Sequence, residues 1–128
     1  MRSLLLPLRV LAVAALAGVG ADHLYLLGKL PYSMQPEIHP LFIATVATAF
    51  AFALLSAVAL RWWIAVLAAA FAFSTLGGYV LAIELPKGIF SFRDVVNTPG
   101  VVAIVAESVA GVALLAWTSI WARVGRWA

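Results

Sequence analysis

Four long apolar runs, separated by short breaks, constrain this chain more than any other feature of its sequence. A helix needs about 20 predominantly apolar residues to cross the hydrocarbon core of a bilayer. The runs cover residues 4–27, 41–60, 62–85 and 99–121. We therefore expect an all-α fold: one transmembrane domain, residues 1–128, built as a polytopic membrane four-helix bundle.

The breaks between the runs contain residues that interrupt helices. Residues 28–40 hold three prolines, Arg61 alone marks a very short turn, and residues 86–98 begin with Pro-Lys-Gly. Proline lacks the backbone N–H that a helix interior needs, so prolines between apolar runs indicate where helices end. Pro99 is suited to the first turn of the last helix.

Composition excludes most soluble proteins. Apolar residues make up 66% of the chain and charged residues 10%, and the mean hydropathy is +1.11. A soluble domain of this size could not bury so much apolar surface. The lipid bilayer is therefore the expected partner. No nucleic acid is expected despite the pI of 9.8, because the few basic residues lie at the ends of apolar runs. The absence of cysteine removes thiolate metal sites and disulfides.

The first run also has features of a cleaved signal peptide. Arg2 precedes an apolar stretch that ends in the small residues 19–21. However, the apolar run continues through residues 24–27, and Pro7 and Arg9 interrupt its first part. We therefore expect an uncleaved first helix.

Basic residues predict the orientation, because cytoplasmic ends carry an excess of Lys and Arg. Five lie on the side of the termini: Arg2, Arg9, Arg61, Arg123 and Arg126. Three lie on the side of the long loops: Lys29, Lys87 and Arg93. Tryptophans near the terminal side resemble an interfacial belt: Trp62, Trp63, Trp117, Trp121 and Trp127. Both termini are expected in the cytoplasm.

Glu107 is the main functional candidate, because ionisable groups inside a membrane span are costly. Gly100, Ala103 and Gly111 share its helix face at spacings of three and four residues. This face permits close helix packing and predicts that Glu107 points into the bundle. The alternative is a structural carboxyl, kept neutral by burial or bonded to a neighbouring helix.

Asp22 and His23 lie one turn inside the outer end of the first helix. Asp22 shares a face with Gly18 and is expected to point inward. Either residue could reach Glu107 and hold a proton, a metal or an axially ligated cofactor. The alternative is a His–carboxylate hydrogen bond between helices. If a metal is bound, His23 and Glu107 are the candidates, but no cofactor is predicted.

The third span and the second loop supply further polar candidates. Tyr79 and Glu84 lie near the outer end of the third span, where Glu84 could simply face lipid headgroups. In the following loop, Arg93 and Asp94 are expected to form an interfacial ion pair.

Small residues predict where helices touch. Gly18, Gly78 and Gly111 each lie four residues from another small or polar residue on their helix face. Such spacing is typical of close helix–helix contacts in membranes.

Several short motifs resemble a family of small four-span integral membrane proteins from actinobacteria. They are residues 23–26, residues 40–42, residues 76–79 and residues 88–93, followed by Glu107 in the last helix. The family is uncharacterised, so the resemblance implies architecture and no activity. It places the protein in a bacterial cytoplasmic membrane. Family members commonly carry Glu where this chain has Asp94.

These features leave three hypotheses for function. The first is a non-enzymatic accessory or interaction subunit with a polar ligand or ion pocket in the outer half of the bundle. The second is a proton- or cation-coupled small transporter that works as an oligomer through Glu107. The weakest is a haem- or metal-binding subunit that uses His23.

The orientation predicts the outcome of reporter fusions. A reporter fused after Ala128 should be active in the cytoplasm, because the basic residues favour that side for the termini. Reporters that work only outside the cytoplasm, fused at the same position, would contradict the orientation.

Overall fold

The computed structural model of the chain describes residues 1–125. Its four long helices are α1 (Leu5–Leu27), α2 (Ile38–Ala59), α3 (Trp62–Glu84) and α4 (Thr98–Gly125). Two short 3-10 helices, η1 (Arg2–Leu4) and η2 (Tyr32–Met34), lie before α1 and in the first loop. All four long helices are long and apolar enough to span a membrane. This confirms the all-helical, multi-pass four-helix architecture.

Two helix boundaries differ from expectation by several residues. α2 begins at Ile38 and holds Pro40 in its first turn, where the missing N–H removes no helical hydrogen bond. α4 continues beyond residue 121 to Gly125, because Ala122 and Arg123 are good helix formers. At its other end, the Asn97 side chain accepts a hydrogen bond from the Gly100 N–H at 2.8 Å, which caps the first turn.

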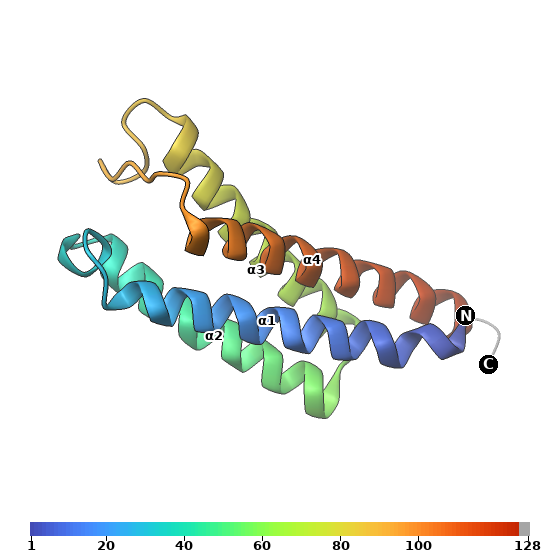
Figure 1. Cartoon of the computed structure of the whole chain (residues 1–128). Coiled ribbons are helices and arrows are strands. Elements are labelled where there is room, and N and C mark those ends of the chain that lie inside the picture. The colour runs from blue at the N-terminus through green and yellow to red at the C-terminus, as the bar shows by residue number, and fades with distance from the viewer. Residues whose placement is uncertain (126–128) are drawn as a thin grey trace.

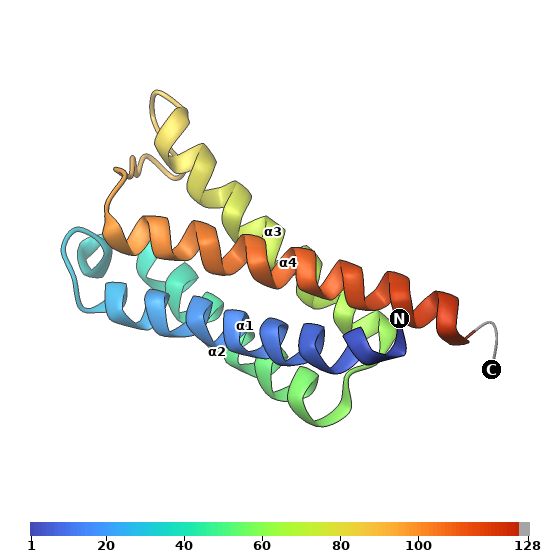
Figure 2. The same ribbon diagram turned by 45° about the vertical axis from the view of Figure 1, so that its right-hand side comes forward.

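Helices α1 and α4 form the centre of the bundle. α2 packs against α1, α3 packs against α4, and α2 and α3 contact each other little. Both views show α3 diverging from the other helices toward its C-terminal end (Figure 1 and Figure 2). We call the end that carries residues 28–37 and 85–97 the loop end. The opposite end, where α1 begins, is the terminal end.

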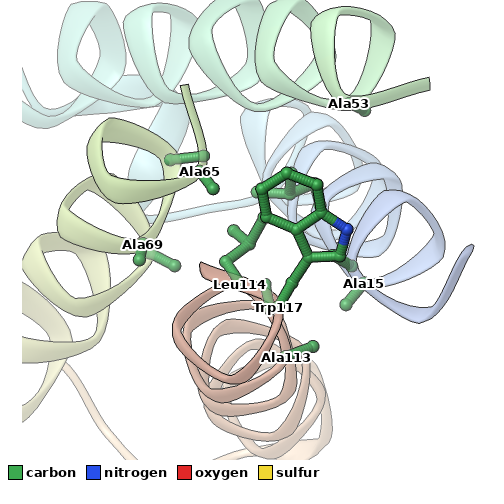
Figure 3. Close-up of a cluster of buried hydrophobic side chains, with 12 residues drawn as sticks. Ala15, Ala53, Ala65, Ala69, Ala113, Leu114 and Trp117 are labelled. Carbon is green, nitrogen blue, oxygen red and sulfur yellow. The ribbon is translucent and has the colours of Figure 1, made fainter. Parts of the chain in front are cut away.

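The terminal half of the bundle has a core made mainly of alanine. Figure 3 shows the Trp117 ring at the centre of this core, surrounded by small side chains of all four helices. Trp117 is only 6% exposed, so the expectation that it belongs to an interfacial belt is wrong. The alanine faces leave a space that one indole ring fills. Trp62, Trp63 and Trp121 are exposed, and Trp127 and Arg126 lie outside the described residues.

Arg9 closes the terminal end of α2. Its guanidinium donates hydrogen bonds to the Ser56 carbonyl at 2.7 Å and to the Ala57 carbonyl at 2.6 Å. The last carbonyls of a helix have no partner within the helix, and a membrane offers few others. Arg9 therefore ties the first helix to the second beside the short turn at Leu60 and Arg61.

The glycine expectations are met at two of three positions. A Cβ on Gly18 would lie 3.7 Å from the Ala106 Cβ, which places Gly18 at the α1–α4 contact. A Cβ on Gly111 would meet the Phe73 ring at 2.6–2.9 Å, which places it at the α3–α4 contact. The expectation for Gly78 is wrong, because a Cβ there would meet no atom within 4 Å. Gly78 lies where α3 diverges from the bundle.

Gly111→Leu should destabilise the bundle. The larger side chain must displace the Phe73 ring, and overpacking of this kind typically costs about 1–3 kcal/mol. The midpoint of thermal unfolding in detergent should fall. Gly77→Leu is the matched control, because Gly77 is also helical and has open space around its Cβ position. Equal midpoints for the two variants would contradict the assigned contact.

Candidate functional site

A cavity of about 330 Å³ occupies the loop half of the bundle. It exists because α2 and α3 separate there while α1 and α4 stay together. Both loops and all four helices contribute to its walls. α1 and α4 supply a back wall of buried residues: Asp22, His23, Leu26, Gly100, Ala103 and Glu107.

The mouth of the cavity lies between α2 and α3. The lining residues that are also exposed on the outside of the molecule are Leu41 and Ala44 on α2 and Ser74 on α3. All three lie within predicted membrane spans. The cavity therefore opens between two helices that are long and apolar enough to span a membrane.

Glu107 points into this cavity, as its helix face predicts. Its side chain is 0% exposed, and Gly100, Ala103 and Gly111 on the same face are also buried. Neither carboxyl oxygen has a hydrogen-bond partner among the described residues. The Thr75 hydroxyl on α3 lies near enough to interact with this carboxyl, although it donates to the Ala72 carbonyl at 2.9 Å. Glu107 is thus a buried carboxyl in the cavity wall with Thr75 as its neighbouring hydroxyl.

Asp22 and His23 line the same cavity from α1. The His23 Nδ1 lies 2.9 Å from the Val19 carbonyl oxygen. A carbonyl can only accept, so Nδ1 carries a hydrogen, and in the neutral imidazole Nε2 keeps its lone pair. The His23 ring meets Phe42 of α2 edge-on, with centroids 5.0 Å apart. The Oδ2 atom of Asp22 is buried without a partner within residues 1–125.

Of the two α3 candidates, only Tyr79 reaches the cavity. Its hydroxyl donates to the Val95 carbonyl at 3.2 Å and packs so closely against Gly100 that any Cβ there would overlap it. Glu84 is exposed at the end of α3 and does not line the cavity. Glu84 is the last residue of α3, and the divergence of this helix places it away from the cavity.

An aromatic cluster closes the loop end of the cavity. We call it the loop cap; it consists of Leu26, Tyr32, Ile38 and Phe92, with Phe42 and Ile89 packed against it. Tyr32 stacks on Phe42 with centroids 5.2 Å apart and contacts Phe92 at 5.5 Å. The cap joins the two loops above the polar groups.

A tight turn brings Phe92 into the loop cap. Ile89 and Phe92 exchange two backbone hydrogen bonds, of 2.9 and 2.7 Å. The two residues between them, Phe90 and Ser91, have φ of 49° and 60°, a left-handed conformation that side chains disfavour. The packing of Phe92 in the cap offsets this strain.

The expected ion pair between Arg93 and Asp94 is absent from the described part of the chain. Asp94 is buried and instead accepts a hydrogen bond from the Tyr32 hydroxyl at 2.7 Å, together with one from the Val95 N–H at 2.8 Å. Arg93 points outward and is exposed. Burial and the bond to Asp94 raise the pKa of Tyr32 above its ordinary value, so its hydroxyl stays protonated and donates.

Sequence reasoning missed the part that Tyr32 plays. Tyr32 and Asp94 are 62 residues apart, and no periodicity connects two loops across a bundle. The only local signal was that Tyr32 lies in a proline-rich segment, which holds a loop in a defined shape.

The polar groups of the cavity do not form an evident metal centre. Within residues 1–125, no group of three His, Asp or Glu side chains is placed to hold a metal ion. Haem or metal binding through His23 stays a hypothesis, which the visible absorption spectrum of the purified protein would test.

Comparison of the chain with protein-family models, curated proteins and solved structures finds no match.

Tyr32→Phe should destabilise the loop end. The buried Asp94 carboxylate would lose a donor, which typically costs about 1–3 kcal/mol. Unfolding in mixed micelles should require less denaturing detergent than for the native chain. Tyr25→Phe makes the same chemical change on an exposed tyrosine and should have little effect. If both variants unfold together with the native protein, the bond between the loops contributes nothing.

Proposed function

We propose that this protein is a small, non-enzymatic integral membrane protein that binds a ligand in the cavity of its loop half. It would act in a bacterial cytoplasmic membrane as an accessory or interaction subunit, with the loop end outside. The observation that carries this proposal is Glu107, which is 0% exposed, lines the cavity and has no hydrogen-bond partner within residues 1–125.

The energetics of burial support a ligand at Glu107. An unpartnered polar group in an apolar environment is costly, and intramembrane carboxyls are correspondingly rare. A ligand that bonds to Glu107 from inside the cavity would offset this cost. The cavity is also typical of small-molecule sites, which measure about 300–1,000 Å³ and are mostly apolar with a few polar groups.

The arrangement of hydroxyl groups favours binding over catalysis. Nucleophilic catalysis needs a hydroxyl that is hydrogen-bonded to a base. In the described chain, Thr45 and Thr75 donate to backbone carbonyls of their own helices, and His23 bonds through Nδ1 to Val19. The polar groups of the cavity therefore serve better as ligands than as a nucleophile with its base.

A second candidate is proton- or cation-coupled transport by an oligomer. The free carboxyl oxygens of Glu107 favour it, because such a carboxyl can exchange a proton for a substrate. In proteoliposomes, this function predicts substrate-dependent proton flux in the native protein and none in Glu107→Gln.

Photolabelling tests whether the cavity accepts a guest from the bilayer. A small apolar phenyldiazirine, added to the protein in nanodiscs, should label the back wall near Ala103 as well as the lipid-facing surface. Ala103→Phe should remove the back-wall labelling because it fills the cavity. Val105→Phe is the matched control on the exposed face of α4 and should leave it unchanged. Labelling confined to lipid-facing residues such as Val102 would contradict the proposal.

A further inference from the structure

We propose that the ligand is a lipophilic organic cation, a protonated amine on an apolar body, that reaches the cavity between α2 and α3. This inference rests on the proposed binding function and specifies its ligand class. It follows from the hydrogen-bonding groups, the charges and the shape of the cavity.

The cavity offers acceptors and few donors. Six hydroxyl groups line it, and five of them already donate within the described chain. Their acceptors are Asp94 for Tyr32 and backbone carbonyls for the others: Thr45, Ser74, Thr75 and Tyr79. Only Thr48 makes no such bond. A ligand that mainly accepts hydrogen bonds would find almost no free donor among these hydroxyls.

When the two carboxyls are ionised, the free polar atoms of the back wall are all acceptors. They are both carboxyl oxygens of Glu107 and the Oδ2 atom of Asp22, none of which has a partner within residues 1–125. The Nε2 atom of His23 joins them, because its Nδ1 carries the hydrogen. An alkylammonium group has up to three N–H donors and no acceptor. Its bonds to carboxylates are charge-assisted and therefore strong.

The charges around the cavity have one sign. Asp22, Asp94 and Glu107 line it, and neither lysine nor arginine does. The potential inside is therefore negative when these carboxyls are ionised, and low-dielectric walls strengthen it. An anionic ligand would be repelled, whereas a cation would neutralise Glu107.

The walls and the mouth require the cation to carry an apolar body. The aromatic rings of Phe42 and Phe71, together with aliphatic side chains, cover most of the remaining wall. The opening at Leu41, Ala44 and Ser74 lies within membrane spans. A bare metal ion would need several ligands at one point, and no such group of three occurs among residues 1–125. A cation attached to an apolar body can instead partition into the bilayer and enter sideways.

Three probes of similar shape test the ligand class. They are phenylbutylamine, phenylbutanol and phenylbutanoate, which carry a cationic, a neutral and an anionic group at neutral pH. Binding to the protein in nanodiscs is measured by isothermal titration calorimetry, with empty nanodiscs subtracted. We expect saturable binding of the amine, at least tenfold tighter than binding of the alcohol or the acid.

A matched pair of variants tests the role of Glu107. Glu107→Gln should weaken amine binding at least tenfold and leave binding of the alcohol unchanged. Glu84→Gln makes the same chemical change on a carboxyl outside the cavity and should have no effect. Circular dichroism checks that both variants fold. If Glu107→Gln does not fold, Ala103→Phe takes its place, because blocking the cavity should abolish amine binding.

The outcomes separate this inference from the proposed function. If the alcohol or the acid binds as tightly as the amine, and Ala103→Phe abolishes that binding, the cavity binds ligands but the cationic class is wrong. If none of the three probes binds saturably and the diazirine does not label the back wall, the proposed function fails as well.

Discussion

The close packing of α1 against α4 is the contact on which the rest of the bundle depends. Gly18 and Ala106 let the two helices approach, and alanines continue the contact toward the terminal end. Small residues provide this closeness in membranes, where lipid tails are as apolar as side chains and helices must associate by packing. α2 packs against α1, and α3 packs against α4. The two outer helices are left free to separate at the loop end, and the cavity lies between them.

The absence of water from the hydrocarbon core divides the polar residues into two groups. Several hydroxyls of the spans donate to a backbone carbonyl, as in Thr45 and Thr118, and Arg9 does so at the end of α2. These groups are satisfied and serve the fold. The Ser56 hydroxyl is a buried exception without a partner in residues 1–125. Asp22 and Glu107 keep carboxyl oxygens without a partner in residues 1–125, and both face one cavity. The clustering of two such carboxyls around one cavity distinguishes the site from the scaffold.

Sequence alone predicted those features that depend on spacing along one helix. Four apolar runs indicated four helices, and the small residues around Glu107 indicated that it points inward. Features that depend on pairs of distant elements could not be predicted in this way. The bond between Tyr32 and Asp94 joins two loops, and the burial of Trp117 depends on alanines of the other helices. Gly78 was misplaced for the same reason, since the divergence of α3 is a property of the whole bundle.

The weak contact between α2 and α3 also bears on how the protein assembles. The bundle is two helical hairpins, α1–α2 and α3–α4, that meet along α1 and α4. The first hairpin is synthesised with Asp22 and His23, whereas the rest of the same back wall, including Glu107, belongs to the helix made last. The cavity therefore comes into being only when the second hairpin docks. A chain arrested before α4 would lack Glu107 and have no enclosed site.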